Sequence, residues 1–133
     1  MTPRNRLLAA RIAFFLYLAA IVWLCFGQFD QVPQMQRTIW GIPTDKIAHF
    51  LMFFPFPLLA CLAFGGYRGK PGQAVLKTAL AFLAGCAFAA GTEWVQTRLP
   101  YRSGDPVDFQ ADALALLLSS VIVLLLVLVK HRK

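Results

Sequence analysis

The residues that could do chemistry in this chain begin with the stretch DKIAHF at positions 45–50, directly before a long apolar run. On a helix, Asp45 and His49 lie four residues apart and Lys46 and His49 three apart, so the three side chains share an arc of about 100°. Charged groups at the edge of a membrane-length segment are costly, and they are usually paired and functional. The stretch therefore predicts either an Asp45–His49 ion pair that orients a helix end or part of a polar site.

Two later stretches add titratable groups at helical spacing. Glu93 and Gln96 are three residues apart and share one helix face, and two arginines follow them in a short loop. Three aspartates then come at spacings of three and four, within about 60° of helical arc, and the first of them, Asp105, is predicted to cap the helix N-terminus. The candidate ligand-binding side chains are therefore Asp45, Lys46, His49, Glu93, Gln96, Arg98, Arg102, Asp108 and Asp112.

A divalent metal ion is one partner that these residue types would accept. The candidate metal ligands are His49, Glu93, Asp108 and Asp112. No other cofactor is evident, and the chain contains neither an HExxH metalloprotease motif nor a nucleophile motif such as GxSxG. Plainer roles remain open for the same groups, namely interhelical hydrogen bonds for the Glu–Gln pair and neutralisation of the acids by the two arginines.

The composition indicates an integral membrane protein. Of the 133 residues, 59% are hydrophobic and 14% are charged, whereas about a quarter of a soluble domain is charged. The net charge of +7 lies in short basic clusters at the ends of apolar runs, which is typical of membrane topology signals. We therefore expect the lipid bilayer as a partner and exclude nucleic acid.

The apolar runs predict one all-α domain over residues 1–133, an integral membrane four-helix bundle. Pro55 and Pro57 interrupt the second run and predict a kink near its middle. The polar segment 27–44 contains Trp40 and is expected to lie in the membrane interface, part of it as a short amphipathic helix. The expected spans are about 7–26, 47–64, 74–96 and 107–129.

Small residues mark the predicted contact between the last two spans. Ala81, Gly85 and Ala89 are spaced by four, a pattern that allows helices to approach closely. The next member of the series is Glu93, so its carboxylate is expected on the packed face rather than toward lipid. A second small stripe on the last span comprises Ala111, Ala115 and Ser119.

The charges divide unequally between the two sides of a four-span protein. The side without the termini has four basic residues and all six acids, and the side of the termini has nine basic residues and no acid. This asymmetry predicts that both termini are cytoplasmic and that the polar site opens on the outer face of the inner membrane. The nine are Arg4, Arg6, Arg11, Arg68, Lys70, Lys77, Lys130, Arg132 and Lys133.

Four motifs, in their order and spacing, resemble those of the VanZ-like membrane proteins. They are DKIAHF at 45–50, EWVQ at 93–96, RS at 102–103 and DFQAD at 108–112. The resemblance covers about residues 45–129 and implies a family associated with low-level resistance to the glycopeptide teicoplanin. Asp112 stands where the family usually has Asn before a Gly-rich stretch, which adds a negative charge. The polar positions implied by the resemblance are Asp45, Lys46, His49, Glu93, Gln96, Arg102 and Asp108.

Three classes of function fit these observations. A non-enzymatic module would bind a headgroup, a peptide or a lipid-linked cell-envelope precursor, with Lys46, Arg98 and Arg102 meeting its anions. A membrane-embedded enzyme would use His49 as a general base or metal ligand on a phosphate- or glycan-bearing lipid. A purely structural four-helix protein is the third class, and the sequence favours the first.

Overall fold

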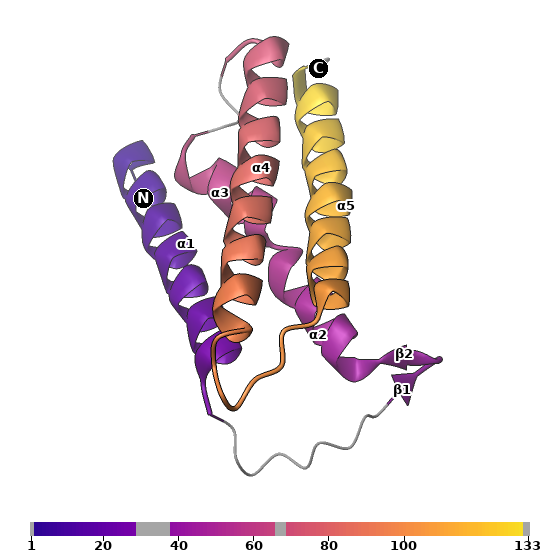
Figure 1. Cartoon of the computed structure of the whole chain (residues 1–133). Coiled ribbons are helices and arrows are strands. Elements are labelled where there is room, and N and C mark those ends of the chain that lie inside the picture. The colour runs from indigo at the N-terminus through magenta and orange to yellow at the C-terminus, as the bar shows by residue number, and fades with distance from the viewer. Residues whose placement is uncertain (1, 29–37, 66–68, 132–133) are drawn as a thin grey trace.

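The computed structural model describes residues 2–28, 38–65 and 69–131, and its architecture is the predicted all-α membrane bundle (Figure 1). Four helical stretches are long and apolar enough to cross a membrane. Asp30, Arg37, Arg68, Arg132 and Lys133, which enter the charge count, lie outside the described residues. The helices are α1 (Pro3–Phe26), α2 (Thr44–Phe53), α3 (Phe56–Ala63), α4 (Pro71–Gln96) and α5 (Pro106–His131).

Prolines set where the helices begin. Pro3, Pro71 and Pro106 each occupy the first position of a long helix, where the missing N–H costs nothing and the fixed φ angle suits the first turn. The spans therefore start one to four residues earlier than the apolar runs alone predicted. Thr2 caps α1 by accepting a hydrogen bond from the Asn5 backbone N–H at 3.2 Å.

The predicted kink in the second span is confirmed as a break between α2 and α3 at Phe54 and Pro55. Proline removes a backbone donor, so a carbonyl near the break needs another partner inside the membrane. The Tyr17 hydroxyl of α1 supplies one by donating to the Met52 carbonyl in the last turn of α2. This hydrogen bond joins the first span to the second near the middle of the bundle.

The described part of the first connection is a β-hairpin, so the amphipathic helix expected there does not extend into residues 38–43. Strands β1 (Thr38–Ile39) and β2 (Ile42–Pro43) pair antiparallel. The residues between them, Trp40 and Gly41, have φ angles of 52° and 79°, as a tight hairpin turn requires. Trp40 is 98% exposed, which suits an indole at a membrane–water interface.

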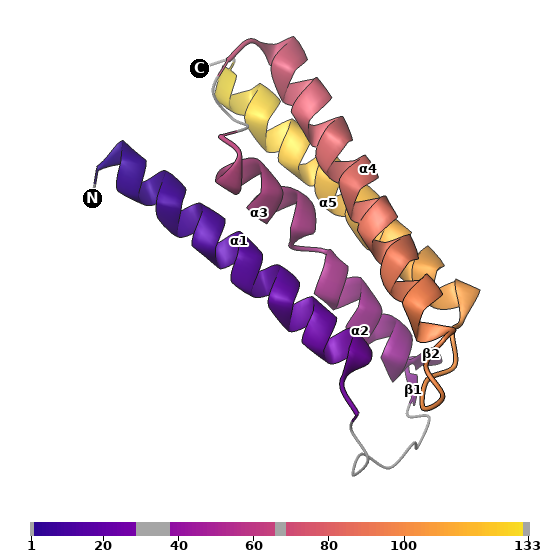
Figure 2. The ribbon, with the colours of Figure 1, turned by 60° about the vertical axis from the view of Figure 1, so that its left-hand side comes forward.

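The spans pack as two adjoining pairs. α4 lies along α5, α2 packs against α5, and α1 packs mainly against α3 (Figure 2). Both termini lie at one end of the bundle, called here the termini end, and the hairpin and the α4–α5 loop lie at the other, the hairpin end (Figure 1). Phe53, Leu116 and Ala89 are fully buried where α2, α5 and α4 meet.

Both predicted small stripes lie in the helix contacts. Ala81, Gly85 and Ala89 are buried on α4, and Ala115 of α5 is 0% exposed. A Cβ atom added at Gly85 would lie 2.6 Å from Leu116 Cδ2, a separation that real side chains do not adopt. Close approach of α4 to α5 therefore depends on glycine at this position.

Gly85→Leu should destabilise the bundle by about 1–3 kcal/mol or more, because a larger side chain overpacks the α4–α5 contact. Leu83→Phe, on an exposed position of the same helix, should change stability by about 0.5 kcal/mol or less. Unfolding of both variants in detergent checks this. Equal stability of the two would mean that the Gly85 face is directed toward lipid.

Candidate functional site

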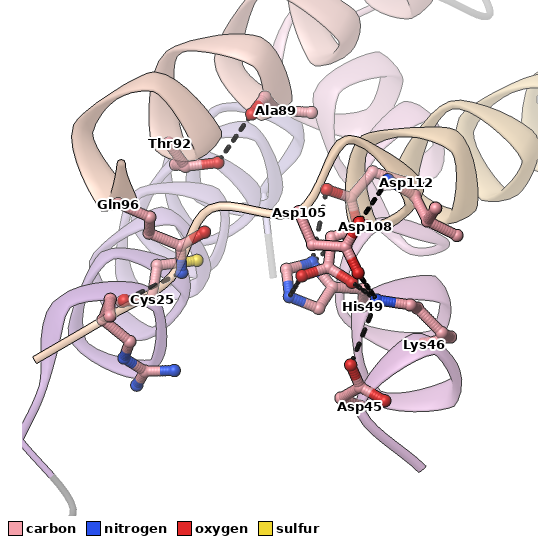
Figure 3. A network of polar contacts seen from close by, with 12 residues as sticks. Cys25, Asp45, Lys46, His49, Ala89, Thr92, Gln96, Asp105, Asp108 and Asp112 are labelled. Carbon is pink, nitrogen blue, oxygen red and sulfur yellow. Dashed lines mark hydrogen bonds and ion pairs between the residues drawn. The ribbon is translucent and has the colours of Figure 1, made fainter. Parts of the chain in front are cut away.

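Lys46 is the centre of a charged cluster at the hairpin end (Figure 3). Its ammonium lies 3.1 Å from the Asp45 carboxylate and 2.6 Å from Asp105, and it also donates to Asp108. The Lys46 and Asp108 side chains are 14% and 12% exposed, so water screens this pair only partly. Lys46, at the start of α2, thereby contacts three carboxylates, and two of these lie at the start of α5. The lysine is the first link between α2 and α5.

His49, one turn further into the membrane, makes the second link between α2 and α5. Its Nδ1 lies 3.1 Å from Asp112 Oδ1, and its Nε2 lies 3.6 Å from Asp108 Oδ2. Asp112 is 1% exposed. A carboxylate buried to this degree requires a partner, and His49 is the partner of Asp112. Within the described residues His49 pairs with α5, and the ion pair expected between Asp45 and His49 does not form.

Asp105 has the predicted helix-capping role and a second one. Its Oδ1 accepts a hydrogen bond of 2.9 Å from the Val107 backbone N–H at the start of α5, while Oδ2 faces Lys46. The Lys46 ammonium, and next the Val107 N–H, hold the pKa of Asp105 below its ordinary value. The ionised cap therefore stabilises the fold above about pH 4, and this stabilisation is lost as the pH falls through the lowered pKa.

Glu93 lies beside this cluster without joining its ion pairs. It sits at the end of the packed face of α4, as predicted, and both carboxylate oxygens are covered by protein. Within the described residues neither oxygen has a hydrogen-bond partner of normal geometry, although the Asp105 backbone N–H is directed at the carboxylate. A Cβ atom at Gly104 would lie 3.0 Å from Glu93 Oε1, so the α4–α5 loop covers this acid closely.

Gln96 and Arg102 hold the end of α1. Gln96 donates to the Cys25 carbonyl at 3.0 Å, and Arg102 Nη2 donates to the Leu24 and Gly27 carbonyls, each at 3.1 Å. The last carbonyls of a helix have no partners within the helix and must find them elsewhere in a membrane. These side chains therefore dock the C-terminus of α1 onto α4 and the α4–α5 loop.

Tyr101 and Tyr17 contribute polar contacts that charge and spacing did not single out. The Tyr101 hydroxyl donates to the Phe26 carbonyl at 3.0 Å, next to the contacts of Arg102. Tyr17 holds the broken second span, as described above. In each case the tyrosine hydroxyl is directed at a backbone carbonyl. An aromatic residue in or beside an apolar run does not indicate from the sequence which carbonyl it will contact.

Arg98 lies apart from the other candidates. Its guanidinium stacks over the Trp94 ring, with Cζ 4.7 Å from the ring centroid, a favourable cation–π geometry. Trp94 is 61% exposed, so the pair lies on the outer surface of α4. Lys46 and His49, rather than Arg98, are the side chains that pair with the aspartates.

A cavity of about 530 Å³ lies between α1 and α2 at the hairpin end. Apolar side chains such as Ile21, Leu24 and Leu51 form much of its wall, and Asp45 and Arg102 line it toward the hairpin and the α4–α5 loop. A volume of this size lies in the range of ordinary ligand pockets. Its polar lining consists of Tyr17, Asp45, His49, Gln96 and Arg102.

The proposed metal ligands form no metal site in this geometry. Within the parts of the chain that the structure describes, no group of three or more His, Cys, Asp or Glu side chains is arranged to hold a metal ion. The Lys46 ammonium faces Asp108, and His49 faces Asp108 and Asp112. The Lys46 ammonium and the His49 imidazole thus stand at the carboxylates that were expected to bind a divalent ion.

No protein-family model matches the chain, and neither a curated protein nor a solved structure matches it. Fold and geometry define the class, a multi-pass membrane protein with a polar cluster and a cavity at one end of a helical bundle.

Lys46→Met should destabilise the protein by about 3–5 kcal/mol, because it leaves buried Asp108 without its cation. Adding Asp108→Asn should restore part of the loss. Lys70→Met, at an exposed lysine before α4, is the control and should be nearly neutral. Unfolding in detergent measures all three, and a stable Lys46→Met protein would contradict the pairing.

Gln96→Leu should cost about 1–3 kcal/mol, since the buried Cys25 carbonyl loses its donor. Gln110→Leu, at an exposed position of α5, removes an amide of the same size and should have little effect. Proteolysis at residue 27 and beyond, with the unfolding midpoint, reports whether α1 has loosened. Equal behaviour of the two variants would show that Gln96 does not dock α1.

Proposed function

We propose that this chain is an inner-membrane protein of the VanZ-like kind that binds a lipid-linked ligand of the cell envelope at the outer face. The cavity between α1 and α2 carries the proposal, because it combines apolar walls with a polar end. An amphiphile with an apolar chain and a polar head has the matching distribution of surface. Three of the four motifs that resemble the VanZ-like proteins supply four of the five polar lining residues, and the fourth, DFQAD at 108–112, contributes the aspartates that pair with His49.

The polar end of the cavity suits a head rich in amide or hydroxyl groups. The Asp45 side chain is 59% exposed and offers acceptors, and His49 and Arg102 also line the cavity. Lys46, expected to meet anions, is already surrounded by three carboxylates. A peptide or glycan head therefore fits the lining better than a bare phosphate.

The charge asymmetry supports an outer position for this cavity. Nine basic residues and no acid belong to the side of the termini, so the positive-inside rule places the termini in the cytoplasm. The cavity lies at the opposite end of the bundle. A ligand in the outer leaflet would then reach it from the side, between α1 and α2.

An enzyme acting on the same amphiphile is the second candidate, and one observation favours it. His49 lines the cavity while Asp112 orients its Nδ1 at 3.1 Å, the arrangement that a general base requires. Against this, Nε2 faces Asp108 rather than open space. An enzyme would convert the bound amphiphile, whereas a binding module would return it unchanged.

Ala20→Phe should weaken ligand binding strongly, because Ala20 lines the cavity and a phenyl ring there occupies part of the space between α1 and α2. Ala19→Phe, at the neighbouring exposed position outside the cavity, is the matched control and should bind normally. The probe is a fluorescent short-chain analogue of a lipid-linked peptidoglycan precursor, titrated in detergent and recovered for mass spectrometry. Equal binding by both variants would refute the site, and a chemically altered probe would support the enzyme.

A further inference from the structure

A second cavity lies at the opposite end of the bundle, between α1, α3 and α4. Its volume is about 390 Å³, and most of its lining is apolar. Phe14 of α1 meets Phe56 of α3 and Phe64, the residue after α3, edge-on, with ring centroids 5.5 and 5.8 Å away. Leu80 and Ala84 of α4 form the facing wall. Packed rings give this groove a fixed shape, which suits an apolar chain.

One charged side chain, Lys77, lines the groove. It lies six residues after Pro71, roughly 9 Å along the helix from its start, so its ammonium must reach back toward the headgroup region. Its contact with the Gly65 carbonyl is 3.5 Å, at the long limit for a hydrogen bond. Lys77 therefore keeps most of its capacity to meet an anion.

The surroundings of Lys77 are positive. Arg11 of α1 donates from Nε to the Ala63 carbonyl at 3.1 Å, so two cations from different helices stand at the end of α3. All six acids of the chain belong to stretches of the other side. Within residues 2–28, 38–65 and 69–131, neither Lys77 nor Arg11 forms an ion pair. An apolar groove that ends at two such cations is complementary to a lipid with a negatively charged head.

We propose that this groove binds an anionic phospholipid of the leaflet on the side of the termini. One acyl chain lies between Phe14, Phe64 and Leu80, and the phosphate meets the Lys77 ammonium. The site is separate from the cavity between α1 and α2, and it stands or falls independently of the ligand proposed there. Its occupant would fill the gap between α1 and α4 and support the docking of α1.

Native mass spectrometry of the protein with phosphatidylglycerol and phosphatidylcholine of identical chains tests the proposal. The intact protein should bind phosphatidylglycerol about fivefold more tightly, the effect of one lysine at a membrane surface. Lys77→Gln should remove this preference and keep weak binding of both lipids. Lys70→Gln, an exposed lysine outside the groove, should keep the preference.

A second pair of variants tests the groove itself. Ala84→Phe should reduce binding of both lipids, because the ring occupies the space of the acyl chain, whereas Ala87→Phe, exposed and outside the groove, should not. Unchanged preference in Lys77→Gln, or unchanged binding in Ala84→Phe, would overturn the proposal. Equally tight binding of chain-free glycerol phosphate, or a lipid-free dimer in place of the lipid complex, would overturn it as well.

Discussion

Two buried aspartates of α5 have partners on α2, and the arrangement of this bundle follows from the need to pair such carboxylates inside a membrane. Asp108 and Asp112 on α5 are 8% and 1% exposed, which would be prohibitive for isolated charges. Lys46 and His49 on α2 meet them one helical turn apart. A shift of α2 along α5 would separate both pairs at once. The pairs therefore fix the register of the second span against the fourth, and the apolar contacts around Phe53 and Leu116 pack within that register.

The same requirement acts on backbone carbonyls and determines where α1 lies. The end of α1 is held by Gln96, Tyr101 and Arg102, while Arg11 ties its other half to the end of α3. These contacts attach α1 to α3, α4 and the α4–α5 loop, whereas α2 is attached to α5. Because α1 and α2 are held mainly by different partners, with the Tyr17–Met52 hydrogen bond as a link between them, a cavity remains between these two helices at the hairpin end. Polar side chains that donate hydrogen bonds to the carbonyls of the helices thus also line the cavity that a ligand could enter.

The sequence predicted the spans, the break at Pro55, the packed face of Gly85 and the convergence of the acids with α2, because spacing fixes which side chains share a helix face. Of the two roles that it left open for His49, the ion pair with Asp45 does not form, since residues on one helix compete with residues on another that spacing cannot locate. It also missed the docking of α1, because Gln96 and Arg102 bind backbone carbonyls, which every residue possesses and no motif marks. The sequence did not predict the hairpin at Trp40 and Gly41, where two positive φ angles reverse the chain, and residues 29–37 of the segment in which a short amphipathic helix was expected lie outside the described residues.

The most direct test of this account is a structure of the full chain in lipid nanodiscs, resolved well enough to place side chains between α1 and α2. The account predicts His49 between Asp108 and Asp112, the end of α1 bound through Gln96, Tyr101 and Arg102, and an open cavity that holds an amphiphile with its head at Asp45 and His49. A bundle in which α1 packs directly on α2 and closes the cavity, with His49 turned away from α5, would contradict it.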